Sequence, residues 1–397
     1  MGFTTGVRKF HAMGGGFRYH AGMKEAIEQI QSQVKEAARL SRTLRVVGGG
    51  TKDFLGEPLQ GQPLSTAGLS GVIAYEPTEL VITAGAGTPL AEIQALLAEQ
   101  RQYLPFDPPQ WGASSTLGGV VAAGLAGPAR ASVGGVRDFV LGAHMVNGKA
   151  ELLQFGGQVM KNVAGYDVSR LLAGSMGTLG VITQLSVKVL PLPLAEKTLA
   201  WRGRQEDALA QLLRWRAKPL PIDASCWSAL ASEAEMGTLW VRLRGAQVAI
   251  DVAVEHMRAD TSESSLAWQD DGSALDWDAV RDQSHAFFSQ PPAPDACLWR
   301  LSVPPATPVM TLGLPRLMEW HGAQRWFWAN VQEAHGLRDW AARVGGHATL
   351  FRTSTAHAEA DKKVGVYSKQ APVLTQINAR LQAQFDPCGV FRTQRLG

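Results

Sequence analysis

Three glycine-rich segments combine residue types and spacings that suit a phosphorylated or flat ligand. They are Gly48-Gly49-Gly50-Thr51-Lys52, Ser114-Ser115-Thr116-Leu117-Gly118-Gly119, and the stretch 174–182, which reads Gly-Ser-Met-Gly-Thr-Leu-Gly-Val-Ile. Positions without a side chain allow a backbone to approach a ligand closely. Successive backbone N–H groups in a bend also bind anions, and hydroxyl groups add further donors.

Each segment, taken alone, has a plain structural interpretation. A glycine run also makes an ordinary hairpin turn, and the small residues of 114–124 also suit a tightly packed buried helix. Gly177 to Ile182 can be a simple turn into a buried strand. The three segments in this order favour a ligand cradle more than any one of them does.

A fourth glycine pattern, in residues 80–97, imitates a dinucleotide-binding fingerprint. A strand leads into Gly85-x-Gly87 and then a helix, but Leu90 occupies the third small position. No acidic residue ends a second strand about 20 positions on, since Asp107 lies in a proline-rich loop. This argues against a nicotinamide site. We expect a tight turn before a helix that has Thr88 as its N-cap.

Hydrophobic periodicity and turn residues predict the elements that hold these segments. In the first half they are a helix from Met23, with Ile27, Ile30, Val34 and Ala38 on one face; strands at Leu44–Val47, Val72–Tyr75 and Leu80–Ala84; a helix from Pro89 to about Gln100; a hairpin of 136–146 and 151–155 about Asn147-Gly148; and an apolar strand from Val181.

Composition divides the chain near Pro191-Leu192-Pro193. Of the 42 glycines, 30 precede residue 195, whereas 11 of the 12 tryptophans follow it. We therefore expect an N-terminal arm or mis-assigned start (1–22), a ligand-binding domain (23–194), a tryptophan-rich α+β cap or partner domain with an antiparallel sheet (195–370), and a C-terminal helix and tail that return to the first domain (371–397).

Strands and helices alternate in the second half. The expected strands are 198–201, 238–244, 298–303, 324–330 and 347–352, and the expected helices are 205–216, 246–258, 331–343 and 371–385. The last helix has Val373, Ile377, Leu381 and Phe385 on one face. Trp320, Trp326, Phe327 and Trp328 form the densest aromatic cluster, for which we favour an intramolecular core; it is also the best candidate in the chain for a partner surface.

Charge and cysteine content exclude several classes of protein. The formal net charge of +3 and the lack of a Lys/Arg stripe give no indication of a surface that binds nucleic acid. No apolar run reaches the ~18 residues of a spanning helix, so we expect a cytoplasmic protein, which partners could hold at the inner face of the cell membrane. Cys226, Cys297 and Cys388 are too scattered to hold an iron–sulfur cluster, and we expect no metal.

The motifs in sequence order resemble a known family. Gly-Gly-Gly-Thr, Glu-Pro-x-Glu-Leu-Val-x-x-Ala-Gly, Thr-Leu-Gly-Gly, Gly-x-Arg-Asp-Phe-Val-Leu-Gly and Gly-Ser-x-Gly-Thr-Leu-Gly are similar to the FAD-binding domain of the vanillyl-alcohol-oxidase or p-cresol methylhydroxylase (PCMH) type. The runs 48–54, 161–167 and 346–350 more closely resemble the FAD-binding E subunit of bacterial glycolate oxidase. The resemblance is strong over 23–194, thins in the tryptophan-rich half and returns at 385–391.

This resemblance implies a two-lobed PCMH-type fold with non-covalent FAD, because Lys52-Asp53-Phe54 continues the first loop where some relatives place a tethering histidine. The implied cofactor-binding residues are Gly48, Gly49, Gly50, Thr51, Lys52, Ser114, Ser115, Thr116, Gly118, Gly119, Gly124, Tyr166, Gly177, Thr178, Gly180 and Ile182. Two positions depart from the family: Met176 replaces its usual glutamate, and Phe391-Arg392-Thr393-Gln394-Arg395 replaces its usual Phe-Asn-Pro-Gly-Arg.

Oxidation of a 2-hydroxy acid needs a base for the hydroxyl proton and a cation for the carboxylate. The histidine motif of autonomous relatives is missing here, so the nearest candidates are His347, with His357, Arg352 and Arg300. Lys161 could steady negative charge on a reduced flavin, and Tyr166 could hydrogen-bond the ring. The alternatives remain open: these polar residues could only fix a loop, the arginines could face water, and the histidines could be structural.

The resemblance implies an FAD-binding subunit of a glycolate oxidase or dehydrogenase complex, which would oxidise glycolate to glyoxylate. Its implied partners are a second FAD-binding subunit and an iron–sulfur subunit that takes the electrons. Two alternatives remain: a stand-alone FAD-dependent dehydrogenase for another 2-hydroxy acid such as D-lactate, and a non-catalytic assembly subunit.

Overall fold

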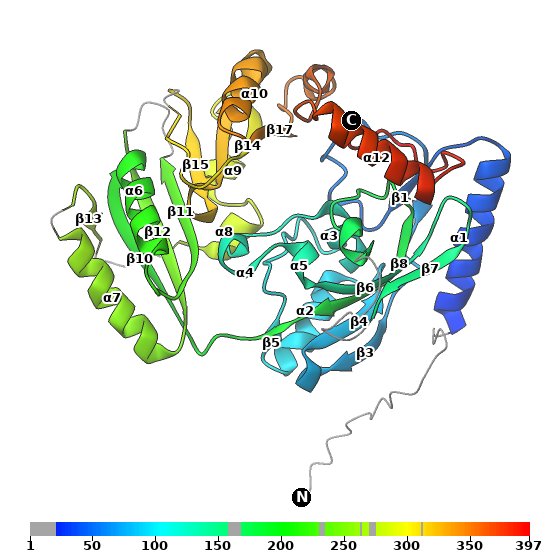
Figure 1. The fold of residues 1–397 in the computed structure, drawn as a ribbon, viewed down its shortest axis with the longest axis horizontal. Coiled ribbons are helices and arrows are strands. Elements are labelled where there is room, and N and C mark those ends of the chain that lie inside the picture. The colour runs from blue at the N-terminus through cyan, green and yellow to red at the C-terminus, as the bar shows by residue number, and fades with distance from the viewer. Residues whose placement is uncertain (1–20, 158–167, 230–234, 263, 270–274, 311–312) are drawn as a thin grey trace, which may run out of the picture.

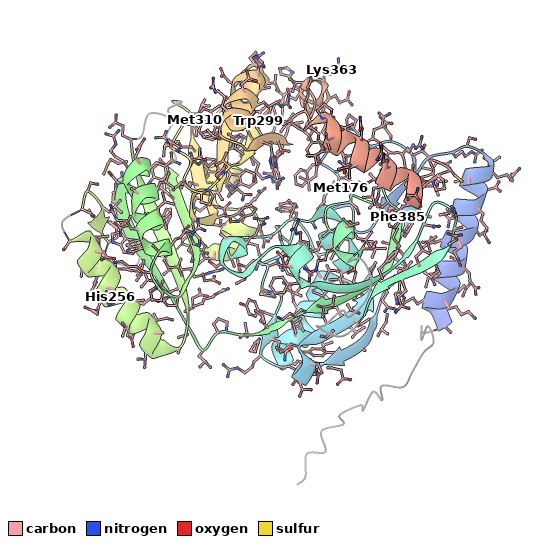
Figure 2. All side chains as sticks on the ribbon, viewed as in Figure 1. Met176, His256, Trp299, Met310, Lys363 and Phe385 are labelled. Atoms are coloured by element: carbon pink, nitrogen blue, oxygen red, sulfur yellow. The ribbon has the colours of Figure 1, made fainter. Side chains whose placement is uncertain are left out.

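Two large antiparallel sheets organise the chain, one in each half of the molecule (Figure 1). The computed structural model describes residues 21–157, 168–229, 235–262, 264–269, 275–310 and 313–397. Side chains fill both halves, with Met176 in the N-terminal half and Trp299 in the other (Figure 2). Mixed helices and antiparallel sheets confirm the predicted α+β class.

The N-terminal half is built on a five-stranded sheet with the strand order β3-β4-β8-β6-β7. Two small sheets accompany it: β1 pairs with β2 in parallel, and β5 pairs with β9. The strands of this half are β1 (Leu44–Val47), β2 (Gln62–Ser65), β3 (Val72–Glu76), β4 (Val81–Gly85), β5 (Gln102–Tyr103), β6 (Val140–Val146), β7 (Leu152–Gly156), β8 (Val181–Lys188) and β9 (Leu190–Pro191).

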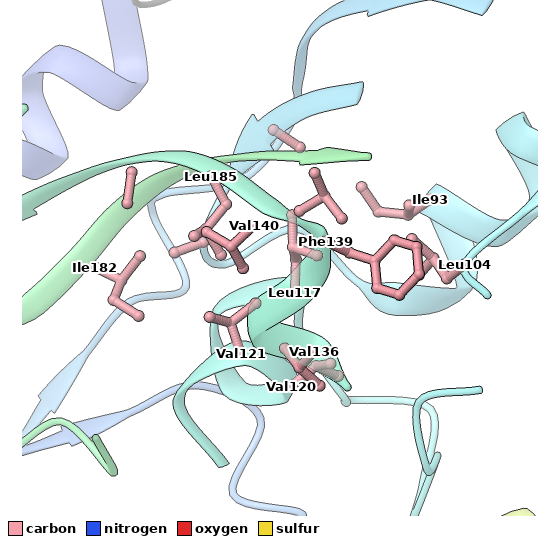
Figure 3. Packing of buried hydrophobic residues seen from close by; sticks show 14 of the residues in the cluster. Ile93, Leu104, Leu117, Val120, Val121, Val136, Phe139, Val140, Ile182 and Leu185 are labelled. Atoms are coloured by element: carbon pink, nitrogen blue, oxygen red, sulfur yellow. The ribbon is translucent and has the colours of Figure 1, made fainter. Parts of the chain in front are cut away.

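Helices cover this sheet and close its core. They are α1 (Ala21–Arg39), α2 (Leu90–Glu99), α3 (Leu117–Ala123), α4 (Arg130–Val133) and α5 (Val136–Phe139). Leu117, Val120 and Val121 of α3 pack with Val140 of β6 and Leu185 of β8 (Figure 3). Apolar side chains of α1 form a second cluster, with Leu44, Leu64 and Val181. The amphipathic face predicted for α1 is confirmed at Ile27, Ile30 and Val34, which are buried; at its fourth position Ala38 is half-buried and the neighbouring Ala37 is buried instead.

Two local predictions in this half were wrong. Pro89, not Thr88, is the N-cap of α2, because the Thr88 hydroxyl donates a hydrogen bond to Gly85 O at 2.7 Å inside the preceding turn. The predicted first strand of the 136–146 hairpin begins only at Val140. Residues 136–139 form α5, where Asp138 accepts a hydrogen bond from the Gly135 N–H and so closes a helical turn.

The second half is built on an eight-stranded sheet with the order β13-β10-β12-β11-β15-β16-β14-β17. All of its neighbouring strands pair antiparallel, as predicted for the cap. The strands are β10 (Ala195–Arg204), β11 (Ile222–Ala229), β12 (Met236–Gly245), β13 (Ala267–Trp268), β14 (Cys297–Ser302), β15 (Arg316–Glu319), β16 (Gln324–Ala329) and β17 (His347–Arg352). Sequence reasoning missed β11, β13 and β15.

The helices of the second half and the C-terminal region are α6 (Gln205–Arg216), α7 (Gln247–Thr261), α8 (Trp277–Arg281), α9 (Ala286–Ser289), α10 (Ala334–Arg343), α11 (Ala358–Asp361) and α12 (Pro372–Phe385). The candidate partner surface at Trp320, Trp326, Phe327 and Trp328 is contradicted, since all four side chains are at most 8% exposed. They fill the core beside the sheet because large aromatic rings bury the most apolar area there.

The chain returns to the N-terminal half after α12. The Leu44 N–H donates a hydrogen bond to Val390 O at 2.7 Å, and Val390 and Phe391 join the α1 cluster. Asp386 is fully buried, and its carboxylate accepts hydrogen bonds from the Val390 and Phe391 N–H groups at 2.8 and 2.7 Å. These bonds fold the closing Asp-Pro-Cys-Gly-Val-Phe motif into a turn and fix the tail against β1.

Candidate FAD-binding site

The three glycine-rich segments meet in the N-terminal half around one pocket of about 800 Å³. Its lining includes eleven of the residues predicted from the sequence: Gly48, Gly49, Gly50, Thr51, Lys52, Thr116, Gly118, Gly119, Gly177, Gly180 and Ile182. The first segment follows β1, the second opens α3 and the third enters β8. The fold therefore makes one concave surface from three separate segments, the first and last of which are more than 100 residues apart in sequence.

The glycines of the first segment are needed because two loops touch. A Cβ atom on Gly49 would lie 1.6 Å from the carbonyl oxygen of Ser114, and one on Gly48 would lie 2.6 Å from Thr116 Oγ1. Gly50 has a φ of +70°, which L side chains rarely adopt. The sequence suggested glycine for close approach to a ligand. The structure shows that glycine first allows the loops to approach each other.

The second segment places the start of α3 at the pocket. Thr116 is the N-cap, and its hydroxyl accepts a hydrogen bond from the Gly119 N–H at 3.2 Å. Ser114 and Ser115 do not line the pocket. Ser114 Oγ donates to Gly49 O at 2.9 Å, and Ser115 Oγ accepts from Lys52 Nζ at 2.9 Å. These two hydroxyls join the loops instead.

The third segment forms the far wall. A Cβ on Gly180 would lie 2.5 Å from Val146 O, and Met176 takes a left-handed φ of +51° while it lines the pocket. The predicted residues Thr178 and Gly124 do not line the pocket. The Thr178 hydroxyl donates to Ser175 O at 2.7 Å within the turn, and Gly124 is the left-handed C-cap of α3.

Lys52 supplies a cation at the pocket. Its ammonium donates to the hydroxyls of Thr51 and Ser115, and no carboxylate of the described residues lies within ion-pair distance of it. Burial lowers the pKa of Lys52 to about 8, against a weaker raising effect of Asp282. A half-buried ammonium without a counterion suits a ligand phosphate or the electron-rich edge of a flavin.

Some lining residues were not predicted. Arg45 and Asp53 form an ion pair at 3.3 Å next to the first segment, and Arg395 donates to Asp53 O at 2.7 Å. The first two flank the glycine run, so their position could have suggested them. Arg395 belongs to the C-terminal tail, and no local sequence pattern predicts that this residue lines the pocket.

The predicted catalytic residues lie apart from this pocket. His347 begins β17 with an exposed side chain, and neither it nor Arg352 lines the pocket. Arg352 lies at the junction of the two halves, where its guanidinium contacts the Phe54 ring and donates to Gln283 Oε1 at 2.8 Å. Lys161 and Tyr166 fall outside the described residues.

The pocket fits the predicted cofactor. Backbone at two glycine bends and a helix start provides anion-binding groups, and Val46, Ala122 and Ile182 provide an apolar surface for flat rings. No histidine or cysteine is among the described residues that line it, so a covalent tether has no candidate there. The features define an FAD-binding flavoprotein fold of the PCMH type.

Comparisons with known proteins agree. Residues 24–156 match the family described as "FAD binding domain". The chain is 38% identical over 369 residues to "Glycolate oxidase subunit GlcE" of Escherichia coli (strain K12), covering 93% of this chain and 97% of that protein. It is 32% identical over 143 residues to "Glycolate oxidase subunit GlcD" of Bacillus subtilis (strain 168), covering 36% and 30%. A solved p-cresol methylhydroxylase has the same fold, with a TM-score of 0.68 at 12% identity over 94% of this chain and 87% of that one.

The chain belongs to the GlcE family of glycolate oxidase subunits. Its cofactor is FAD. Within the described residues, no helix combines the length and apolarity needed to cross a membrane.

Replacement of Lys52 tests whether its ammonium group contributes to FAD binding in the pocket. We expect Lys52→Met to raise the Kd for FAD about ten- to a hundredfold, since a charge-assisted hydrogen bond contributes ~1.5–3 kcal/mol. The pKa of about 8 means that the charge is lost as the pH rises, so the difference from wild type should narrow between pH 7 and pH 9.5. Fluorescence titration of the apoprotein measures both effects. Lys35→Met, on the exposed face of α1, is the control, and equal Kd values for the two variants would contradict the assignment.

Proposed function

We propose that this chain is the FAD-carrying subunit of a glycolate oxidase or dehydrogenase complex, and that its flavin passes electrons from glycolate to an iron–sulfur partner subunit. The observation that carries the proposal is the three-segment pocket in a chain that aligns with a glycolate oxidase subunit over nearly its whole length. We further propose that residues 23–194 and the tail 371–397 form the FAD-binding domain, and that 195–370 form the cap.

In this proposal FAD, when bound, supplies the two-electron chemistry, and the chain holds and shields it. The segments 48–52, 116–119 and 177–182 contact the cofactor, and Lys52 offsets its negative charge. Phe54, Trp111 and Phe351 pack edge to face, with ring centroids 5.0 to 6.0 Å apart, where the two halves meet. This aromatic cluster excludes water beside Lys52.

The electrons need an acceptor outside this chain. Cys226 and Cys297 are buried singly and Cys388 is exposed, so these thiols do not form a cluster site. This supports an iron–sulfur partner subunit. A second FAD-binding subunit that carries the substrate histidines completes the proposed complex, which we place in the cytoplasm, peripheral to the inner face of the membrane through its partners.

Native purification tests this function. A tagged chain should co-purify with a second flavoprotein and an iron–sulfur protein, and the complex should reduce a dye with glycolate. Dye reduction with glycolate or D-lactate by the isolated chain would favour a stand-alone dehydrogenase. A complex that stays active after this chain has lost its flavin would favour an assembly role. Either result would contradict the proposal.

Helix α12 offers a surface for such a partner. Val373, Leu374 and Ile377 are 66%, 54% and 53% exposed, although the predicted apolar face extends through Leu381 and Phe385 onto the N-terminal core. Arg380 is the single charged residue of this helix. An uncharged, exposed apolar face is typical of a protein contact.

A charge on this face should break the contact. We expect Ile377→Asp to lower co-purification of the partner subunits at least tenfold while the isolated chain keeps its FAD. Val252→Asp is the matched control, because Val252 is 55% exposed on α7 between acidic residues. Unchanged co-purification of Ile377→Asp, or equal losses in both variants, would contradict a partner contact at α12.

A further inference from the structure

A second, smaller cavity lies where the two halves meet. About 310 Å³ of non-atom space, open solvent included, lies between Trp111, Leu125 and Gly127 of the N-terminal half and Arg300, Glu319 and Gln324 of the eight-stranded sheet. On the sheet side these polar residues stand beside Trp326 and Phe351, and the residues of the N-terminal half are apolar. None of its lining residues belongs to the larger pocket.

Arg300 is a cation without an anionic partner. It lies on β14 with its guanidinium 5.2 Å from the centre of the Phe351 ring, and among the described residues that guanidinium forms no ion pair and no hydrogen bond. Other arginines of this half are engaged: Arg242 pairs with carboxylates, and Arg325 donates to backbone carbonyls. A guanidinium carries five N–H donors in a fixed fork that matches a carboxylate. Arg300 therefore offers an unused carboxylate-binding group to the cavity.

Glu319 places a carboxyl group in the same cavity. It is 4% exposed and accepts hydrogen bonds from Trp326 Nε1 at 2.6 Å and Gln324 Nε2 at 3.0 Å, both on Oε2. Burial raises the pKa of Glu319 to about 7. Glu319 and Arg300 line one cavity, yet no ion pair joins them among the described residues. A ligand with an acid group and a hydrogen-bonding group can lie between them.

The small cavity is a neighbour of the larger pocket. Lys52 lines the larger pocket and lies 5.7 Å from the centre of the Trp111 ring, which lines the smaller one. The chain also runs directly from Ala123, in the larger pocket, to Leu125, in the smaller one. Lys52 and Trp111 therefore place the two pockets on adjacent parts of the fold.

We propose that the small cavity binds a small 2-hydroxy carboxylate, with Arg300 pairing its carboxylate and Glu319 accepting a hydrogen bond from its hydroxyl group. This inference rests on the proposed function and assigns substrate contact to this chain. Trp111 and Trp326 limit the cavity to acids with a short carbon chain. In this arrangement the buried Glu319 carboxyl supplies the acceptor for the hydroxyl proton.

Calorimetric titration of the FAD-loaded chain with glycolate and with acetate tests the proposal. Wild type should bind glycolate, and Arg300→Gln should raise that Kd at least tenfold, because a bidentate ion pair is lost. Arg300→Lys keeps the positive charge but cannot form a bidentate contact, so its Kd for glycolate should lie between those of wild type and Arg300→Gln. If Arg300→Gln does not fold, Arg300→Lys is the variant that tests the proposal. Arg343→Gln, exposed at the end of α10, is the control and should bind as wild type does.

Glu319→Gln tests the hydroxyl contact. Wild type should prefer glycolate over acetate, and the variant should lose most of that preference while it keeps its affinity for acetate. Absence of glycolate binding to wild type, or an unchanged Kd in both Arg300 variants, overturns the pocket assignment. Such a result leaves the proposed function intact if the native complex still oxidises glycolate, since a partner then supplies the substrate site.

Discussion

Gly49→Ala should yield a chain that no longer retains FAD. The added Cβ would lie 1.6 Å from the carbonyl oxygen of Ser114, a backbone atom that cannot rotate away. The first and second segments must then separate, and both line the pocket. Overpacking of a well-fitted site costs ~1–3 kcal/mol, and a backbone clash is at the upper end of that range. We expect the FAD-to-protein ratio to fall at least tenfold, measured by flavin absorbance after gel filtration.

Gly336→Ala is the control that distinguishes this clash from a general effect of replacing glycine by alanine. Gly336 lies in α10, where the nearest atom to an added Cβ is Glu333 Oε2 at 4.0 Å. Gly336→Ala should stabilise the chain by ~0.5–1 kcal/mol, since alanine favours a helix interior, and should leave the FAD content unchanged. Full retention of FAD by Gly49→Ala would show that the contact of the two loops is not needed for binding.

Arg242→Met should destabilise the chain by about 3–5 kcal/mol. Arg242 is 3% exposed, and it pairs with Asp223 of β11 at 2.6 Å and with Asp107 of the N-terminal half at 2.8 Å. Burial raises the pKa of Asp223, and Arg242 and Arg244 oppose that rise. Removal of one partner from a buried ion pair leaves uncompensated charge, which explains the size of the loss. Chemical denaturation followed by circular dichroism measures it.

Two further variants isolate the ion pair. Arg202→Met, an exposed arginine on the same sheet, should change stability by less than ~0.5 kcal/mol. Asp223→Asn combined with Arg242→Met should recover part of the lost free energy of unfolding, because the double variant no longer buries an unpaired carboxylate at position 223. A loss below ~1 kcal/mol for Arg242→Met would contradict a stabilising role of its ion pairs at the junction of the halves.

The cradle was predictable because its signal is local. The left-handed turn at Gly50 and the Thr116 helix cap involve residues close in sequence, whereas Gly48 and Gly49 are required by contact with the distant loop of Ser114 and Thr116. Thr88 shows the limit of this reasoning. A threonine before proline suits an N-cap, but a carbonyl three residues earlier competes for its hydroxyl.

Contacts between distant segments were not predictable. Arg395 joins the pocket only because the tail folds back onto β1, and the cavity of Arg300 and Glu319 exists only because two halves meet. The aromatic cluster of Trp320, Trp326 and Trp328 gave no sign of whether it faced a partner or a core, since both environments favour large rings.

Flavin content of the gently purified chain tests the central claim most directly. The pocket predicts one FAD per chain, released into the supernatant when the protein is precipitated with acid, because no described lining residue offers a covalent tether. A chain that contains no FAD and binds none when FAD is added back would contradict the account.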